Sequence, residues 1–257
     1  MSDTPSSMSN DDALARIRIV LVRTSHPGNI GAAARAMYTM GLTCLTLVAP
    51  KRAPDDEAVA LAAGAAHILE RARAVASLDE ALAGAALTIG LSARRREFVG
   101  RALGVREAAQ EAIANAQHGD VAIVFGTEMS GLTNDELARC AIAATIPANP
   151  KYPSLNLAAA VQVVTYELRA AAAGTRGWEA PRYSPATYDE IEGLHSHAQR
   201  TLTALAFLNP AMPKRLLPRL RRLFARAALE REEVNILRGI LARVDELIAD
   251  RNRQNRR

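Results

Sequence analysis

The sequence predicts an α/β protein with a mostly parallel sheet, followed by a smaller all-helical part. Over residues 17–173, short apolar runs alternate with helical patterns, which is the order expected when helices connect parallel strands. A stretch with two glycines, two prolines and the only tryptophan follows at 174–185, and beyond it the apolar patterns are helical. We therefore divide the chain into a disordered N-terminal segment (1–16), an α/β domain (17–173), a linker (174–186) and a helical domain (187–257).

The strands are predicted from apolar runs of five to seven residues, which are typical of strands buried on both faces. These runs are 17–22, 42–48, 87–91, 121–125 and 141–146. Helical patterns accompany them at 29–40, 55–65, 78–83, 105–116, 133–139 and 154–173. Asn29 and Ser154 are placed to act as N-caps, and Thr133 with Glu136 forms a capping box.

The helical domain is predicted to contain helices at 187–208, 213–228 and 231–249. The last of these has apolar residues at three- and four-residue spacing, which form a single stripe along the helix. The stripe consists of Val234, Leu237, Leu241, Val244 and Ile248.

Composition excludes several classes of protein. With 49% hydrophobic and 23% charged residues among 257, the chain is globular. Two cysteines, Cys44 and Cys140, are too few for a disulfide scaffold or a cysteine-rich zinc site. The N-terminus lacks the features of a signal peptide, and no apolar run reaches the roughly 20 residues that a membrane span needs. We therefore expect a cytoplasmic protein that does not enter the membrane.

The net charge of +5 is distributed unevenly along the chain. Residues 200–257 contain 14 basic and 6 acidic residues, whereas residues 1–199 contain 18 basic and 21 acidic residues. Nearly all the positive charge is arginine, whose guanidinium group suits bidentate contacts with phosphate. A basic module on a mildly acidic body favours a polyanionic partner such as nucleic acid. The alternative is a compositional bias toward arginine with solvated helix faces. If the partner is RNA, an aromatic content of 4% excludes binding mainly by base stacking.

Three stretches do not have the pattern of an ordinary helix or strand. The first, 25–37, follows a predicted strand and opens a helix, so its free N–H groups could hold an anion. No Gly-Lys-Ser/Thr follows, which excludes a P-loop, and the Gly-x-Gly-x-x-Gly spacing of a dinucleotide site is absent. Arg35 lies in the alanine-rich helix of this stretch and is either a surface arginine or a functional residue.

The second and third stretches also begin where a predicted strand ends. In 124–132, Gly126 either permits close approach of the backbone to a ligand or forms a tight turn before the next helix. In 146–158, the N-cap role would by itself explain Ser154. Asn156 inside the first turn of that helix is less expected, because asparagine is a poor helix former.

Two other groups of polar residues were considered as candidate sites. His195 and His197 are two residues apart and do not share a helix face, so no metal site is expected. Arg94, Arg95 and Arg96 follow a predicted strand and are either solvated charges or phosphate contacts.

Taken together, the three stretches resemble the SPOUT superfamily of RNA methyltransferases, and most closely the TrmJ type of tRNA ribose 2′-O-methyltransferase. The residues similar to the three motifs of that family are 17–22, 24–26 and 28–37 for the first, Phe125, Gly126, Glu128 and 131–134 for the second, and Asn149, Pro150, Tyr152 and 154–158 for the third. Residues 235–239 are similar to the helical extension of the family. Each motif alone is weak, but the three occur in register and the resemblance covers almost the whole chain.

The resemblance implies a SPOUT fold, in which the C-terminal part of the parallel α/β domain forms a deep trefoil knot. It also implies S-adenosylmethionine as methyl donor, bound by backbone groups of the knot loops. The positions carried over for donor binding are Leu91, Ser92, Ala93, Gly126, Ile146, Pro153, Ser154 and Leu155. Pro153 departs from the family, which usually has serine there, and a proline has no N–H to donate.

The family also places five side chains at the reacting ribose. The matching residues here are Arg35, Asn29, Glu128, Ser154 and Asn156. Family accounts sometimes make the arginine a base, but a guanidinium group almost never loses its proton. We therefore expect Arg35 to clamp the adjacent phosphate and to stabilise negative charge developing on the ribose oxygen. Ser154 and Asn156 would orient the hydroxyl group, and no metal is required.

The resemblance implies a homodimer formed through the knotted domain, with Arg35 of one subunit beside the donor held by the other. The terminal helices are expected to add contacts, because the apolar stripe of the last helix needs a covering surface.

The expected RNA contacts are all arginines, namely Arg23, Arg94, Arg95, Arg96, Arg215, Arg219, Arg222 and Arg226. The last four follow three- or four-residue spacing and so share one helix face. The alternative is that these four pair with Glu230, Glu232 and Glu233 and contact no RNA.

The resemblance suggests that the target is a pyrimidine, cytidine or uridine, at the first nucleotide of the anticodon loop of tRNA. One alternative is a 2′-O-methyltransferase acting on another tRNA or rRNA position, and another is a non-catalytic RNA-binding module that has lost donor binding. The presence of Gly126, Ser154 and Asn156 together favours the enzyme. The absence of a P-loop disfavours a nucleotide hydrolase.

Overall fold

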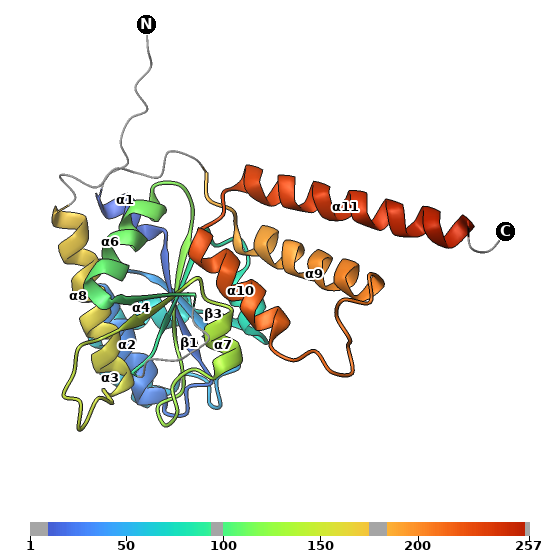
Figure 1. Ribbon diagram of the computed structural model, residues 1–257. Helices are drawn as coiled ribbons and strands as arrows, with labels where there is room; N and C mark the ends of the chain where they lie inside the picture. Colours follow the sequence, from blue (N-terminus) through green and yellow to red (C-terminus); the bar gives the residue numbers. More distant parts are fainter. Residues whose placement is uncertain (1–9, 94–99, 175–183, 255–257) are drawn as a thin grey trace, which may run out of the picture.

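The computed structural model describes residues 10–93, 100–174 and 184–254, and it shows a parallel sheet between helices with a helical extension at one side (Figure 1). The predicted RNA contacts Arg94, Arg95 and Arg96 lie outside the described residues, as does most of the predicted linker.

The sheet has seven strands in the order β3-β2-β1-β6-β4-β7-β5, and every pairing is parallel. The strands are β1 Ile17–Val22, β2 Cys44–Val48, β3 Arg73–Val75, β4 Leu87–Leu91, β5 Arg101–Gly104, β6 Val121–Phe125 and β7 Ile142–Thr145. The five predicted strands and the predicted fold class are confirmed. The prediction missed β3 and β5, which are only three and four residues long and lack a continuous apolar run.

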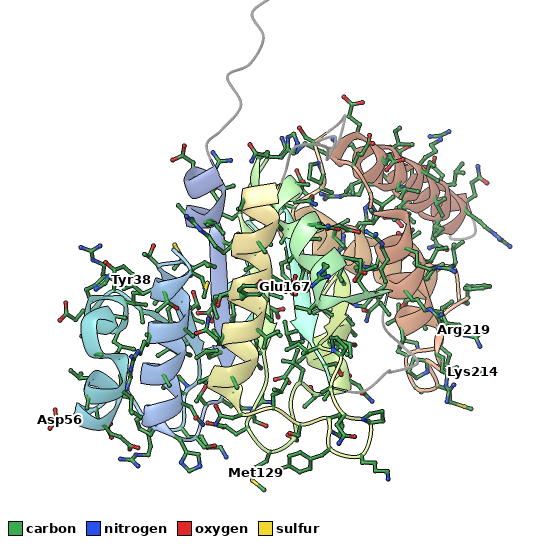
Figure 2. All side chains as sticks on the ribbon, turned by 90° about the vertical axis from the view of Figure 1, so that its left-hand side faces the viewer. Tyr38, Asp56, Met129, Glu167, Lys214 and Arg219 are labelled. Carbon is green, nitrogen blue, oxygen red and sulfur yellow. The ribbon has the colours of Figure 1, made fainter. Side chains whose placement is uncertain are left out.

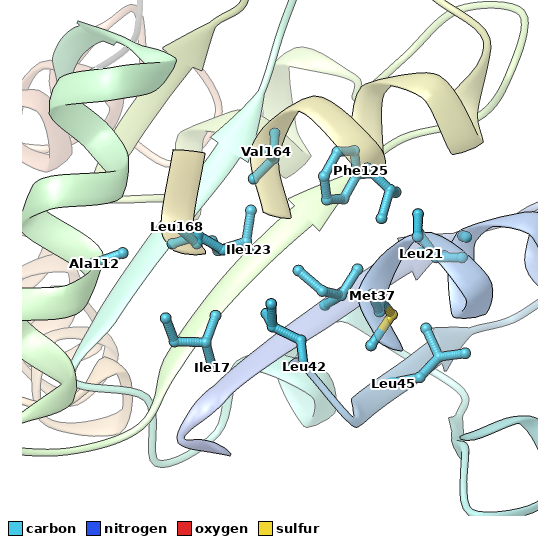
Figure 3. Close-up of a cluster of buried hydrophobic side chains, with 14 of the residues drawn as sticks. Ile17, Leu21, Met37, Leu42, Leu45, Ala112, Ile123, Phe125, Val164 and Leu168 are labelled. Atoms are coloured by element: carbon cyan, nitrogen blue, oxygen red, sulfur yellow. The ribbon is translucent and has the colours of Figure 1, made fainter. Parts of the chain in front are cut away.

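Helices cover both faces of the sheet. They are α1 Asn10–Ala15, α2 Pro27–Thr39, α3 Asp56–Ala62, α4 Ala66–Glu70, α5 Leu78–Leu82, α6 Val105–Ala116, α7 Asn134–Ala138 and α8 Leu157–Gly174. The side chains of β1 point alternately to the two faces of the sheet. Ile17, Ile19 and Leu21 belong to one apolar cluster, and Val20 and Val22 belong to the other. The larger cluster lies between the sheet and α2, α6 and α8 (Figure 3).

Two predictions for the N-terminal half are wrong. In the segment 1–16, which was expected to be disordered, the described residues Asn10–Ala15 form α1, and Ala13 and Leu14 are fully buried in the larger cluster. The helix predicted at 55–65 breaks at Ala63, whose φ of 49° is left-handed, and a short 3-10 turn then leads into α4.

The predicted helix starts at Asn29 and Ser154 are also wrong. Helix α2 begins at Pro27, a residue suited to the first helical position because that position needs no N–H donor. Helix α8 begins at Leu157, and the side chain of Asn156 accepts hydrogen bonds from the backbone N–H groups of Ala158 and Ala159. This capping role explains why asparagine occurs at position 156, which helix propensity alone does not explain. The capping box of Thr133 is confirmed.

The helical extension consists of α9 Tyr188–Ala204, α10 Leu216–Ala227 and α11 Arg231–Gln254. The predicted apolar stripe of α11 packs against α9 in the same chain, where Val234 and Leu194 are buried and Leu237 and Leu241 are partly buried. These three residues of the stripe are therefore covered within the chain and do not by themselves require a second subunit. Among the described residues, no helix is both long enough and apolar enough to cross a membrane.

The extension is attached to the α/β domain through the start of α9 and through α10. The backbone N–H of Tyr188 donates to the carbonyl of Ala85 at 2.7 Å, and the Tyr188 hydroxyl donates to the carboxylate of Asp79. Arg139 also pairs with Asp79, so one carboxylate joins α5, the end of α7 and α9. These contacts fix the extension beside the sheet (Figure 1).

Candidate active site

A cleft of about 550 Å³ lies where the central strands β4, β6 and β7 end. It is lined by residues from the loops that follow these strands and by the first turns of α8. Its lining includes all eight positions predicted for donor binding, which are Leu91, Ser92, Ala93, Gly126, Ile146, Pro153, Ser154 and Leu155. Residues from three distant parts of the sequence therefore meet at one edge of the sheet.

The loop after β6 is closed on itself by a short antiparallel bridge. The backbone N–H of Gly131 donates to the carbonyl of Thr127 at 2.9 Å, and Thr127 donates back at 3.3 Å. A Cβ atom at Gly126 would lie 2.0 Å from the carbonyl carbon of Gly131, so the close approach requires glycine. At the loop tip, Met129 projects into solvent below the sheet (Figure 2).

The carboxylate of Glu128 is held by donors from the loop after β1. It accepts hydrogen bonds from the backbone N–H of Ser25 at 3.0 Å, the backbone N–H of His26 at 3.2 Å and the side-chain amide of Asn29 at 3.1 Å. Burial by itself raises the pKa of Glu128, but its own backbone N–H and these donors outweigh burial and lower the pKa below its ordinary value. The residue is therefore an anion that joins two loops.

A chain of hydrogen bonds continues from Glu128 to the start of α8. Asn29 uses its Nδ2 for Glu128, and its Oδ1 accepts from Nδ2 of Asn156 at 3.1 Å. The Oδ1 of Asn156 in turn caps α8. Each amide is thus oriented by its neighbours, and one residue from each of the three motif stretches takes part.

Ser154 lies just before this cap, is exposed and lines the cleft. Its hydroxyl is therefore not needed to start α8 and faces a space where a ligand can bind.

Arg35 lies apart from these groups. It is exposed on α2, six residues after Asn29, and it does not line the cleft. Arg23 has a left-handed φ of 49° and pairs with the nearly buried carboxylate of Glu136 at 2.6 Å.

The predicted basic face lies on and just before α10. Arg219, Arg222 and Arg226 are exposed on this helix, and Arg215 precedes it. Lys214 and Arg219 project outward from the extension (Figure 2). Two neighbouring arginines form ion pairs inside the extension, Arg221 with Glu192, and Arg231 with Glu190 at 2.8 Å.

Sequence reasoning missed several residues of the site. Thr127, Ser130, Leu157 and Ala160 also line the cleft, and their positions inside or next to the motif stretches were the available signal. The backbone N–H groups of the loop after β1 had no side-chain signal, because any residue type supplies them.

The fold and the cleft define the class of protein. A parallel α/β sheet with a cleft formed by the loops at the carboxyl ends of its strands is an arrangement that binds small ligands. The profile of the SpoU rRNA Methylase family matches residues 16–166, and the profile of the tRNA methyltransferase TrmJ C-terminal domain matches residues 189–256. The chain belongs to the SpoU methylase family and, within it, to the TrmJ group of methyltransferases.

Individual relatives agree with this assignment. A tRNA (cytidine/uridine-2′-O-)-methyltransferase TrmJ from Klebsiella pneumoniae is 50% identical over 238 residues, which are 91% of this chain and 98% of the relative. A tRNA (cytidine/uridine/adenosine-2′-O-)-methyltransferase TrmJ from Pseudomonas aeruginosa is 48% identical over 245 residues, which are 89% of this chain and 93% of the relative.

The fold has solved counterparts as well. The crystal structure of TrmJ from Z. mobilis matches with a TM-score of 0.77 and 33% identity, over 89% of this chain and 98% of that one. The SpoU methyltransferase AviRb from Streptomyces viridochromogenes, solved with AdoMet, shares the fold at a TM-score of 0.50 and 21% identity, over 62% of this chain and 58% of that one.

Proposed function

We propose that the chain uses S-adenosylmethionine to methylate a ribose 2′-hydroxyl of tRNA in the cytoplasm, at a cytidine or uridine that is the first nucleotide of the anticodon loop. The observation that supports this most is the cleft, because its lining includes every position that the family resemblance implied for donor binding. The names of the Klebsiella and Pseudomonas relatives support tRNA ribose as the substrate. The Pseudomonas name adds adenosine to the bases, so base choice varies among relatives.

The residues present fit the donor. Small-molecule sites are typically about 300–1,000 Å³ in volume, and this cleft falls in that range. Its lining offers backbone groups from three loops beside the apolar side chains of Leu91, Ile146 and Leu155. Pro153 contributes only a carbonyl and its ring. When bound, the donor supplies an electrophilic methyl group on a sulfonium.

The side chains around the cleft divide into those that hold the loops and those that act on the substrate. Glu128, Asn29 and Asn156 are bonded to one another and keep the three loops in register. Ser154 is the exposed polar group at the cleft and would orient the ribose hydroxyl, from which a water takes the proton. Arg35 would bind the neighbouring phosphate and stabilise negative charge on the ribose oxygen.

Arg35 supports a homodimer, because it does not line the cleft of its own chain. An arginine placed in this way would reach the reacting ribose at the cleft of a second subunit. We propose that the dimer forms through the α/β domain, with the trefoil knot that the family resemblance implies. Light scattering that shows a fully active monomer at micromolar concentration would contradict this arrangement.

The decisive experiment is mass spectrometry of nucleosides from tRNA that has been incubated with the protein and S-adenosylmethionine. We expect 2′-O-methylcytidine or 2′-O-methyluridine, and fragment mapping should place it at the first nucleotide of the anticodon loop. Methylation at another tRNA position would correct the target, and the same incubation with rRNA in place of tRNA tests the rRNA alternative. No methylation together with tRNA binding would favour the non-catalytic RNA-binding module.

Arg35 provides the test of the side-chain roles. Arg35→Ala should abolish methyl transfer while donor affinity, measured by calorimetry, stays nearly unchanged. Arg35→Lys should also fail, because a point charge does not reproduce the bidentate guanidinium contact. Loss of donor binding in parallel with activity would show that the arginine has a different role.

We propose that the basic face of α10 binds the tRNA backbone outside the target loop without reading sequence. Replacing both Arg219 and Arg222 by glutamate should weaken tRNA binding and flatten its dependence on salt, because fewer counterions are released. Donor binding should be unaffected. A salt dependence equal to that of the unmodified protein would mean that these arginines contact no RNA.

A further inference from the structure

A second cavity, of about 130 Å³, lies at the joint between the α/β domain and the helical extension. One wall comes from strands β4 and β7 and helices α6 and α7, and the other comes from α9, from the residues just before it and from α10. Figure 1 shows α10 beside the sheet, where this joint lies. We call this space the joint cavity. It shares no lining residue with the cleft described above.

The lining of the joint cavity is mostly apolar and includes aromatic rings. Ile142 of β7, Ile191 of α9 and Phe224 of α10 contribute to it. The ring of Phe224 contacts the ring of His195, with centroids 5.5 Å apart and planes at 42°. An apolar cavity of about 150 Å³ in a protein core is large enough to bind benzene. The size and the lining of the joint cavity therefore suit one aromatic ring.

The arginines that line the joint cavity already have carboxylate partners. Arg101 donates to Glu111 at 2.7 Å. Arg221 pairs with Glu192, a bond that joins α10 to α9. Arg139 pairs with the aspartate of α5, as described above. A charged ligand would leave water without gaining a free counter-charge here, which is unfavourable. The paired charges therefore favour a neutral ligand.

His195 supplies a polar group at the joint cavity that has no partner among the described residues. Its ring lines the cavity and contacts Phe224, but neither ring nitrogen forms a hydrogen bond with another residue that the structure describes. Burial lowers the pKa of His195 well below its ordinary value, so the ring is uncharged at neutral pH. A neutral imidazole has one nitrogen that donates a hydrogen bond and one that accepts. One polar group of a ligand can therefore be bound here.

We propose that the joint cavity binds a neutral aromatic ring that carries a hydrogen-bonding group. The ring would pack against Phe224, and its polar group would bond to the imidazole of His195. Because the two walls belong to different parts of the chain, the ligand would hold the extension, and with it α10, against the α/β domain. Such a ring could belong to a free compound or to an unstacked base of bound tRNA, and the experiments below separate the two. The inference does not rest on the proposed reaction, since it uses no residue of the cleft.

The first test is the binding of phenol to the full chain at pH 7, measured by calorimetry. Ala138→Leu and Ile191→Phe enlarge residues on opposite walls of the joint cavity, and each should weaken phenol binding at least about tenfold. Ala227→Leu is the matched control, because Ala227 is exposed on α10 and does not line the cavity. Circular dichroism would check that the variants fold. No phenol binding by the unmodified protein at millimolar concentration, or equal binding by the unmodified protein and both filled variants, would overturn the proposal.

The second test examines the recognition of the neutral ring and of its polar group. Benzoate and benzylamine carry the same ring with a negative or a positive charge at pH 7, and each should bind at least about tenfold more weakly than phenol. His195→Phe keeps a ring at this position but removes the imidazole, so it should abolish the preference for phenol over benzene. Tighter binding of either charged compound, or an unchanged preference in His195→Phe, would contradict the assigned contacts.

The third test addresses the effect of the ligand and its source. Saturating phenol should raise the melting temperature of the unmodified protein and of Ala227→Leu but not that of the filled variants, because a ligand stabilises only the fold that binds it. An equal effect of phenol on all four proteins would overturn the role at the joint. Displacement of phenol by tRNA would identify the ring as a tRNA base, whereas phenol that stays bound beside tRNA would identify a free compound. Methylation of tRNA by the unmodified protein is measured separately, so failure of the proposed reaction would be seen independently of phenol binding.

Discussion

The histidine between the helical extension and the sheet should make the stability of the protein depend on pH. His195 lies on α9, its ring contacts that of Phe224 on α10 with centroids 5.5 Å apart, and it lines a cavity of about 130 Å³ against the α/β domain. The pKa of His195 is lowered from 6.5 to about 4, mainly by burial and also by the nearby charge of Arg221, while Glu192 acts in the opposite direction.

The size and sign of the effect follow from these two pKa values. Because the folded-state pKa is the lower one, the unfolded chain binds the proton more readily, and acid favours unfolding. The stabilising contribution of neutral His195 is complete above pH 6.5 and is lost as the pH falls from 6.5 to about 4. At about 1.36 kcal/mol per pKa unit, the free energy of unfolding should fall by about 2 kcal/mol at pH 5, and by about 3 kcal/mol below pH 4.

The assay is urea unfolding at pH 7 and pH 5, followed by circular dichroism, for the unmodified protein and for His195→Gln. Carboxylates titrate in both proteins, so their effect cancels when the two are compared at each pH. At pH 7 the variant should be the less stable protein, because it loses the ring contact with Phe224. At pH 5 the difference should have shifted in favour of the variant by about 2 kcal/mol. An unchanged difference between the two pH values would refute the reasoning.

Three substitutions test the loops and the core. In Gly126→Ala the new Cβ would lie 2.0 Å from the carbonyl carbon of Gly131, so the loop must open and donor affinity measured by calorimetry should fall at least about tenfold. Gly174→Ala is the control, because a Cβ at Gly174 meets no atom within 4 Å and the donor affinity should stay unchanged. Glu128→Ala leaves three hydrogen-bond donors without their acceptor and should lower the free energy of unfolding by about 1 kcal/mol. Glu128→Gln keeps an oxygen that can accept from these donors, so its loss of stability should be smaller. Equal losses for the two variants in chemical denaturation would mean that the carboxylate does not hold the loops. Gly31→Ala would place a Cβ 2.0 Å from the carbonyl oxygen of Ala58, so α2 and α3 must separate and the melting temperature should fall. A melting temperature equal to that of the unmodified protein would show that this contact adapts without loss of stability.

The sequence was most informative where apolar runs are continuous and where polar residues follow them directly. The strand that begins at Ile17 and the one that begins at Val121 are buried on both faces, and their composition alone identifies them. The parallel arrangement then brings the loops that follow these strands to one edge, and the family resemblance indicated which eight of their residues bind the donor, all of which line the cleft.

Other features depend on contacts that a single segment does not contain. Strand β5 is recognisable only from its pairing with β7, because Arg101 and Gly104 interrupt its pattern. Helix propensity alone counts Asn156 against a helix, whereas its contact with the backbone N–H of Ala158 shows that it caps one. The binding of Glu128 by backbone N–H groups of Ser25 and His26 has no counterpart in side-chain identity, since these donors come from another loop.

The position of α10 has a consequence for any experiment that shortens the chain. Strand β5 is the last strand of the sheet, and the edges of sheets are templates on which further strands can add. Helix α10 lies against this edge so closely that a Cβ at Gly100 would be 2.3 Å from the Cβ of Ala225. A fragment that stops after α8 loses this cover along with the basic face, and its open edge invites polymerisation by strand addition. A fall in its apparent affinity for RNA would then report insolubility as much as the absence of arginines, so point substitutions on α10 are the cleaner measure.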